Sequence, residues 1–127
     1  MAVNFNKDNV FNLKQISNDS VRSEVQALFV PDEEIVMAFQ TIRDQLVFTN
    51  KRIIAIDVQG VTGKRKSFCT MPYSKVQYFT IQTTGFMEIF PDSELYLVFS
   101  NNFTATFEFK GRVDIAEIGR IISTFVL

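Results

Sequence analysis

The chain has 127 residues, of which 46% are hydrophobic and 21% are charged, and these proportions are typical of one folded globular domain. Its formal net charge is -1, so it lacks the overall positive field that would attract nucleic acid or an anionic membrane. It contains 14 Phe but no His, which removes the most common general base and the most common transition-metal ligand.

A helical pattern precedes Pro31. Hydrophobic side chains recur at roughly helical spacing through residues 9–28, with polar residues between them. The tripeptide Asn18-Asp19-Ser20 interrupts this pattern, which predicts one broken helix or two short helices, the second capped from within the tripeptide. Proline disfavours helix at the residue before it, so the helical segment ends there. We therefore divide one compact unit into an N-terminal helical segment, residues 1–32, and a domain, residues 33–127.

From Glu34 onward the hydrophobic period changes to two, which is typical of β-strands. Gly60 and Gly63 follow, and they can adopt positive φ at both ends of a turn. The pattern before these glycines predicts a strand that ends at Ile42-Arg43, a turn at Asp44-Gln45, a strand over residues 46–49, a turn at Asn50-Lys51 and a strand over residues 52–58.

A hairpin is predicted later in the chain. Residues 95–99 and 103–109 alternate between apolar and polar side chains, as half-buried strands do. The Asn101-Asn102 pair between them predicts a hairpin turn, because Asn tolerates positive φ. With the strands before it, this hairpin brings the predicted total to about seven short strands, a number typical of a small antiparallel barrel or sandwich.

An amphipathic helix is predicted over residues 114–127, where hydrophobic residues recur at spacings of three and four. Asp114 and Glu117 stand in capping-box spacing at its start. Gly119 lies inside the helix, where glycine costs about 1 kcal/mol relative to alanine unless close packing requires it. We therefore expect the helix to cross a bulky strand residue at Gly119.

The order of these elements closely resembles the bacterial pleckstrin-homology-like (PH-like) family, long known as a domain of unknown function. The resembling stretches are IRDQLVFTNKRIIAIDVQGVTG, then KRKSFCTMPYSKVQYFTIQTTG, and later SELYLVFS. The resemblance covers about residues 33–127. It implies a mainly β fold: a PH-like barrel of about seven antiparallel strands in two roughly orthogonal sheets, capped by a C-terminal α-helix, with a short helical N-terminal segment.

No arrangement of residues predicts catalysis, a metal site or a cofactor. Cys69 has no second Cys or His with which to share a metal, and its alternating surroundings indicate a buried small hydrophobe. The paired acids, Glu33-Glu34 and Asp92 with Glu94, are typical of a solvated face. The Gly60–Gly63 turn lacks the Gly-Lys-Ser/Thr ending of a phosphate loop. We therefore expect a protein that is not an enzyme and carries no metal or cofactor.

The expected location is the cytoplasm. One cysteine cannot form an internal disulfide, and no signal peptide or lipidation motif is recognisable. No apolar run approaches the roughly 18 residues that a membrane-spanning helix needs. Nucleic acid is not an expected partner, because aromatic nucleic-acid-binding sheets are basic and the polar positions of residues 103–109 carry Thr and Glu.

The basic run Lys64-Arg65-Lys66 is the candidate ligand contact. The resemblance implies that its loop shares an open rim with Arg43-Asp44 and with Asn101-Asn102. Eukaryotic PH domains that bind phosphoinositides use basic residues on that rim, so Lys64, Arg65, Lys66 and Arg43 could hold the phosphate of an anionic lipid headgroup. Lipid-binding relatives carry a long basic loop after the first strand, whereas this one is short and contains an acid. We therefore favour the alternative of a solvated turn.

A second candidate function is assembly. The predicted outward faces of the strands carry Tyr78, Tyr96 and Val98, which is more apolar surface than one helix can cover. Exposed strand edges also pair readily with other chains. The resemblance points the same way, since domains of this type tend to form homo-oligomers, often rings. The alternative is that the N-terminal segment folds back over this surface within one chain.

We therefore expect an interaction module that assembles with itself and presents a rim or edge, with other proteins as further candidate partners. An anionic lipid is the alternative partner. A small-ligand carrier is disfavoured, because side chains such as Phe79, Phe99, Phe107 and Phe109 should fill the interior.

Overall fold

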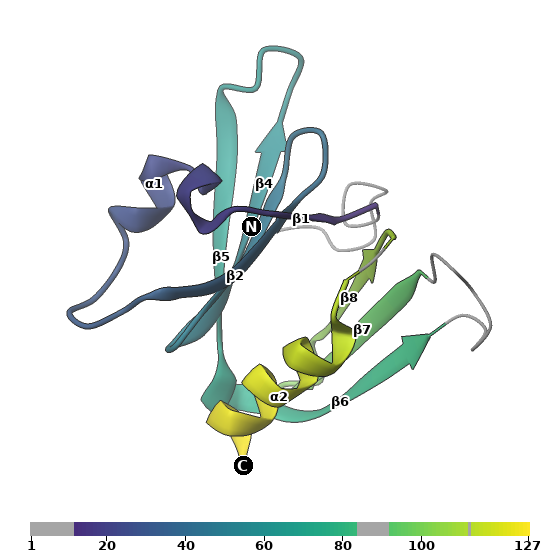
Figure 1. The fold of residues 1–127 in the computed structure, drawn as a ribbon. Helices are drawn as coiled ribbons and strands as arrows, with labels where there is room; N and C mark the ends of the chain where they lie inside the picture. The colour runs from purple at the N-terminus through teal and green to yellow at the C-terminus, as the bar shows by residue number, and fades with distance from the viewer. Residues whose placement is uncertain (1–11, 84–91, 112) are drawn as a thin grey trace.

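The computed structural model describes residues 12–83, 92–111 and 113–127. Within these residues the chain forms two antiparallel sheets, with strand orders β1-β2-β3-β4-β5 and β6-β7-β8, and α2 packs against β6 and η3 (Figure 1). The sheets are the two layers of a sandwich, and the chain passes from one to the other through η3.

The elements have the following bounds. The five-stranded sheet contains β1 (Lys14–Ile16), β2 (Ile35–Gln40), β3 (Gln45–Thr49), β4 (Arg52–Gln59) and β5 (Arg65–Pro72). The three-stranded sheet contains β6 (Val76–Thr83), β7 (Ser93–Phe99) and β8 (Thr104–Phe109). The helical elements are the 3-10 turns η2 (Asn18–Ser20) and η3 (Tyr73–Lys75) and the α-helices α1 (Ser23–Gln26) and α2 (Ile115–Val126).

The main core lies between the two sheets and under α2. Phe39 packs edge-on against Phe48 and Phe109, at ring-centroid distances of 5.9 and 4.8 Å. Such edge-to-face pairs contribute about 1 kcal/mol beyond the area that they bury. Ile118 and Ile122 extend this core from α2. The many Phe residues therefore fill the interior with their own side chains.

A second apolar cluster lies on the opposite face of the five-stranded sheet. Val21 and Val25 of the N-terminal segment pack there with Val47, Ile54 and Ile56 of β3 and β4. This arrangement explains why β3 and β4 are apolar on both sides: both faces of their sheet are covered. In Figure 1, α1 and the chain around it lie beside this sheet, away from α2.

The prediction of helical structure over residues 9–28 is wrong for Lys14–Ile16, which forms strand β1. Lys14–Ile16 pairs antiparallel with Ala38–Gln40 of β2. The N–H of Leu13 donates to the carbonyl of Glu108 at 3.0 Å, and the N–H of Lys110 donates to the carbonyl of Leu13 at 2.9 Å. Backbone partners in both sheets therefore hold this segment extended, against its local helical pattern. Helical structure is present at η2 and α1.

The predicted turn at Asp44-Gln45 is also displaced. β2 ends at Gln40, the turn occupies residues 41–44, and Gln45 begins β3. The hydroxyl oxygen of Thr41 accepts hydrogen bonds from the N–H groups of Arg43 and Asp44, and the Asp44 carboxylate accepts from the Val58 N–H at 2.7 Å. These contacts close the turn early and leave Ile42, which had matched the strand pattern, fully exposed.

The other predicted elements are confirmed. Strands β2 to β8 are the seven that were expected, although the two sheets form a sandwich and not a closed barrel. Asn102 has φ 67°, as the hairpin prediction required. The Asp114 carboxylate caps α2 by accepting from the Glu117 N–H at 3.0 Å. A Cβ on Gly119 would lie 2.7 Å from Cδ1 of Ile81, so the helix does cross a bulky strand residue there.

Candidate functional site

Two turns lie side by side at one end of the five-stranded sheet. The guanidinium of Arg43, in the β2–β3 turn, donates a hydrogen bond to the carbonyl of Gly60 in the β4–β5 turn. A Cβ on Gly63 would lie 3.4 Å from the same guanidinium, and Gly63 has φ 69°, so glycine suits this close approach. Ile42 and Val61 are fully exposed in these turns. The joined turns thus present two apolar side chains next to cations.

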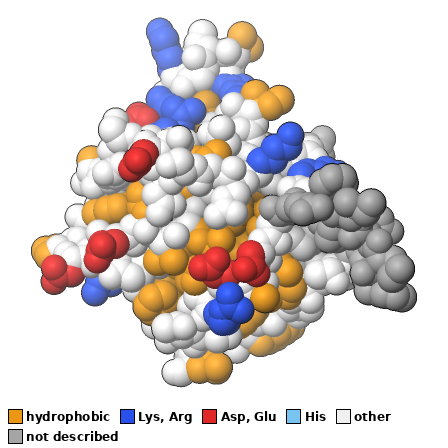
Figure 2. Space-filling view, in the orientation of Figure 1, with side chains coloured by type: hydrophobic (Ala, Val, Ile, Leu, Met, Phe, Trp, Pro, Cys, Tyr) orange, Lys and Arg blue, Asp and Glu red, His pale blue; other side chains and the backbone are white. Residues whose placement is uncertain are grey.

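The predicted basic residues are only partly brought together. Lys64 and Arg65 follow Gly63 and are exposed, whereas Lys66 alternates to the opposite face of β5. There its Nζ lies 3.4 Å from a carboxylate oxygen of Glu24, on α1. Figure 2 shows Lys and Arg side chains gathered where Figure 1 places the β4–β5 turn. The rim therefore contains Arg43, Lys64 and Arg65, with Lys66 turned toward α1.

The Asn101-Asn102 hairpin does not belong to this rim. The N–H of Ser100 donates to the carbonyl of Lys75 at 2.9 Å, which places the hairpin beside η3. Because η3 follows the C-terminal end of β5 and the basic turn precedes its N-terminal end, the hairpin lies at the other end of that strand.

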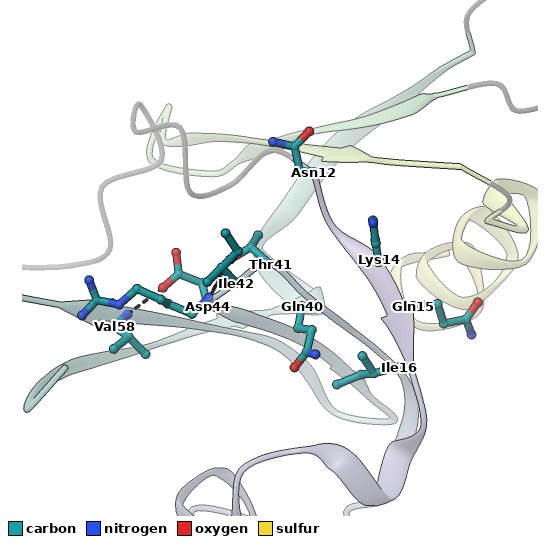
Figure 3. Close-up of a pocket in the computed structure, with 10 residues that line it drawn as sticks. Asn12, Lys14, Gln15, Ile16, Gln40, Thr41, Ile42, Asp44 and Val58 are labelled. Carbon is teal, nitrogen blue, oxygen red and sulfur yellow. Dashed lines mark hydrogen bonds between the residues drawn. The ribbon is translucent and has the colours of Figure 1, made fainter. Parts of the chain in front are cut away.

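An open pocket of about 830 Å³ lies between β1 and the β2–β3 turn (Figure 3). Lys14 and Gln40 line it from paired strands, and Arg43 lines it from the turn. The Asp44 carboxylate also lines it and is directed toward the N–H of Val58. Sequence reasoning missed Lys14 because its segment carries a helical pattern, and only the pairing of β1 with β2 brings it here.

The predicted assembly residues lie on the outer face of the three-stranded sheet. Tyr78 pairs in register with Val98, and Tyr96 pairs with Thr80 on the same face. The exposed fraction is 57% for Tyr78 but only 8% for Val98, and Tyr96 is half-buried. No described helix or strand covers Tyr78, because the N-terminal segment lies on the other sheet.

A buried ion pair was also missed. The Glu33 carboxylate accepts hydrogen bonds from Arg52 Nε at 2.9 Å, from the Thr49 hydroxyl at 2.7 Å and from the Val30 N–H at 3.0 Å. Burial is the largest influence on the Glu33 pKa and raises it, but the three hydrogen bonds and the Arg52 charge together lower it below 4.5. The prediction of a solvated face at Glu33-Glu34 is therefore wrong for Glu33. The buried carboxylate of Glu33 ties the N-terminal segment to β3 and β4.

A metal-binding cluster and a membrane-spanning helix are both absent from the described residues. No group of three or more Cys, Asp or Glu side chains among them is placed to hold a metal ion. In the same part of the chain, no helix is long and apolar enough to span a membrane. Cys69 is half-buried and packs against the main core. The candidate sites are thus surfaces: the basic rim with its pocket, and the tyrosine face.

Solved structures share this fold. A DUF1696 family protein with a pleckstrin-homology domain from Shewanella loihica PV-4 is 35% identical, with a TM-score of 0.79 over 92% of this chain and 99% of that one. A pleckstrin homology domain from Shewanella amazonensis SB2B is 33% identical, with a TM-score of 0.66 over 88% and 90%. A PH-domain-containing protein from Exiguobacterium sibiricum 255-15, 14% identical with a TM-score of 0.69 over 91% of this chain and 62% of that one, is alike in fold.

Two uncharacterized proteins are related to this chain in sequence. The uncharacterized Bacillus subtilis protein YozO is 31% identical over 108 residues, which are 85% of this chain and 91% of YozO. The uncharacterized YjqA of the same organism is 37% identical over 84 residues, 66% of each chain. The family model described as Bacterial PH domain matches residues 4–126. With the sandwich and its capping helix in place, this match shows that the chain belongs to the bacterial PH domain family.

Proposed function

We propose that the protein is a cytoplasmic, non-enzymatic binding module that assembles into a homo-oligomer through the outer face of its three-stranded sheet. The observation that supports this proposal is the exposure of Tyr78, 57%, on a face that also carries Tyr96 and Val98. Tyrosine is enriched in interfaces because it combines a large apolar area with a polar tip. Since the N-terminal segment covers the other sheet, a second subunit is the proposed cover for this face.

The mass of the protein in solution tests this proposal. We expect light scattering after size-exclusion chromatography to give a stable multiple of 14.6 kDa across a dilution series. Tyr78→Glu with Tyr96→Glu should shift the mass toward the monomer, because burying an unpaired carboxylate in an interface is costly. Leu28→Glu is the matched control, since Leu28 is 44% exposed on a different surface. A monomeric parent, or an oligomer that keeps its mass with both changes, would reject the tyrosine face.

A second candidate function is binding to an anionic lipid surface through the rim. It is favoured by a specific observation, the full exposure of Ile42 and Val61 in two joined turns next to cations. Apolar side chains that enter the headgroup region and basic side chains above it are the usual elements of peripheral membrane attachment. Each Lys or Arg near an anionic membrane contributes about 1 kcal/mol, so Arg43, Lys64 and Arg65 together could support weak binding.

Co-sedimentation with vesicles that contain phosphatidylserine tests the lipid proposal. We expect binding at low salt that weakens at high salt, since exposed charges are screened. Lys64→Glu with Arg65→Glu should reduce binding by about tenfold or more. Ile42→Ser with Val61→Ser should reduce it without changing its salt dependence. No sedimentation at low salt would remove this candidate, whatever the oligomeric state.

A further inference from the structure

β6 is an edge strand. It pairs with β7 on one side, and no strand within the described residues pairs with its other side. In a strand, every second residue directs its backbone N–H and C=O toward each side. The outer side of β6 therefore offers a row of donors and acceptors that another extended backbone can satisfy.

The composition of β6 differs from that of β5, one of the two edge strands of the other sheet. β6 has the sequence VQYFTIQT, with no charged residue, no proline and no glycine. β5 carries Arg65, Lys66 and Pro72, which are the residue types that protect an edge from pairing. A register shift between Val76 and Tyr78 disturbs only the start of β6. The rest of this edge is chemically suited to accept a strand.

A shallow, open groove lies between β6 and α2 and has a volume of about 590 Å³. Phe79 and Ile81 are half-buried and form one wall, while Ala116, Gly119 and Ser123 belong to the other. A strand added to β6 would direct alternate side chains toward this groove, because side chains alternate between the faces of a sheet. Apolar side chains would contact Phe79 and Ile81 there.

The charges around the groove indicate what else the added strand carries. Arg120 lines it from α2 with a side chain that is 68% exposed, and it forms a long ion pair with Asp114, at 3.9 Å. Glu117 is exposed on the same helix, and β6 contributes no charge. Figure 2 shows a small charged group among hydrophobic side chains where Figure 1 places α2. A carboxylate on the added strand would complement Arg120.

We propose that the β6 edge and the groove beside α2 bind an extended peptide segment of a partner protein, which adds a strand to the three-stranded sheet. The segment has apolar side chains at alternate positions and an acidic side chain opposite Arg120. Backbone hydrogen bonds to β6 supply affinity, and the groove supplies selectivity. This inference goes beyond self-assembly, because the groove is on the side of β6 that carries Phe79 and Ile81, and Tyr78 is on the opposite side.

A second copy of β6 fits the edge less well than a single strand. In a symmetric pair of β6 strands, the α2 helix of each copy packs against its own β6, so the two helices would lie close to each other beside the paired edge. A peptide brings no helix with it. We therefore assign the site to a peptide, and the test separates the two occupants.

The experiment selects binders from a displayed library of random twelve-residue peptides against the purified full-length chain. Synthetic labelled copies of the selected peptides are then titrated by fluorescence anisotropy. We expect them to share apolar residues at alternate positions with an acidic residue. Amide hydrogen exchange over Val76–Thr83 should slow when the peptide binds, because the edge gains hydrogen-bond partners.

Two substitutions and one control locate the peptide. Ala116→Trp fills the groove and should weaken binding by about tenfold or more, while Glu117→Trp, its exposed neighbour outside the groove lining, should leave the affinity within about twofold. Arg120 is exposed, so Arg120→Glu leaves the core unchanged. This substitution should weaken the affinity for the acidic peptides by about tenfold. Thermal unfolding shows that each variant is folded.

Three results would overturn the proposal. One is a library that yields no binder, and another is a binder that leaves amide exchange in β6 unchanged. The third is protection of β6 that needs no peptide and rises with protein concentration, which would assign the edge to a second copy. Tyr96→Glu lies on β7 and not on the open edge, so it should weaken assembly but keep peptide binding, and failure of this site and failure of the proposed assembly are distinguishable.

Discussion

Two adjacent glutamates, Glu33 and Glu34, occupy very different environments. The side chain of Glu33 is fully buried and accepts hydrogen bonds from Arg52 and Thr49, whereas Glu34 is exposed. Arg52 also donates to the carbonyl of Leu28 at 2.7 Å. The pair thus joins the end of the N-terminal segment to the β3–β4 hairpin.

Glu33→Gln should destabilise the protein by about 2 kcal/mol at pH 7, less than the roughly 3–5 kcal/mol typical of a fully buried pair, because Arg52 is partly exposed. Urea unfolding measures the difference. The matched control is Glu34→Gln, which should stay within about 0.5 kcal/mol of the parent. Equal effects of the two substitutions would show that the buried pair does not contribute as described.

The same carboxyl should give stability a dependence on pH. The pKa of Glu33 is lower in the folded protein than its ordinary 4.5, so the folded state holds the proton less tightly than the unfolded state does. Its stabilising effect is therefore complete above pH 4.5 and is lost as the pH falls through the folded pKa. The stability difference between the parent and Glu33→Gln, measured by urea unfolding from pH 7 to pH 3, should shrink below pH 4.5. A constant difference would contradict this account.

At the scale of elements, the crossing of α2 over β6 depends on one glycine. A Cβ on Gly119 would lie 2.7 Å from Cδ1 of Ile81, which is closer than unstrained contacts allow. Alanine would favour the helix by about 1 kcal/mol, but overpacking costs about 1–3 kcal/mol. The two effects oppose each other, and the contact with Ile81 decides which prevails.

A double-mutant cycle tests this balance. Gly119→Ala alone should be close to neutral, because the shift of the flexible end of Ile81 offsets the gain in helix propensity. In an Ile81→Val background, which lacks Cδ1, the same change should stabilise the protein by about 1 kcal/mol. The coupling between the two sites should be about 1 kcal/mol, measured by chemical denaturation of all four proteins. Additive effects would mean that the helix shifts away from β6 without using this contact.

At the scale of the whole molecule, the N-terminal segment forms a layer outside the five-stranded sheet. Val25 is fully buried in this layer. The side-chain amide of Gln45 holds the same segment, since it accepts from the Arg22 N–H at 3.0 Å and donates to the Ser20 carbonyl at 3.1 Å. Both faces of that sheet are therefore covered within one chain, which leaves the three-stranded sheet to offer an open face and an open edge.

Val25→Asp should release this layer, because a buried carboxylate without a partner costs about 3 kcal/mol or more. We expect lower stability to urea and stronger binding of a hydrophobic dye, as Val47 and Ile54 become exposed. Gln26→Asp, at the exposed neighbouring position, is the control and should change stability by about 0.5 kcal/mol or less. If both variants behave alike, the segment does not stabilise the sheet.

The candidate surfaces could be predicted only in part. Alternation placed Tyr78, Tyr96 and Val98 on one outward face, and the structure puts them there. Their exposure could not be predicted, because it depends on what neighbouring strands and segments cover, and Val98 is in fact buried. Likewise, the basic run was evident as a run, but strand alternation and the ion pair with Glu24 direct Lys66 away from Lys64.

Local chemistry in the sequence was sufficient for the presence of β2 to β8 and α2, though not for the exact ends of β2 and β3, and for positive φ at Gly60, Gly63 and Asn102. A period of two, a period near 3.6, and the φ preferences of Gly63 and Asn102 are properties of a few neighbouring residues. Tertiary structure alone decided that residues 14–16 form a strand and that Glu33 is buried with Arg52. Both outcomes depend on hydrogen-bond partners far away in the chain, and those partners are brought close only when the two sheets and the N-terminal layer pack together.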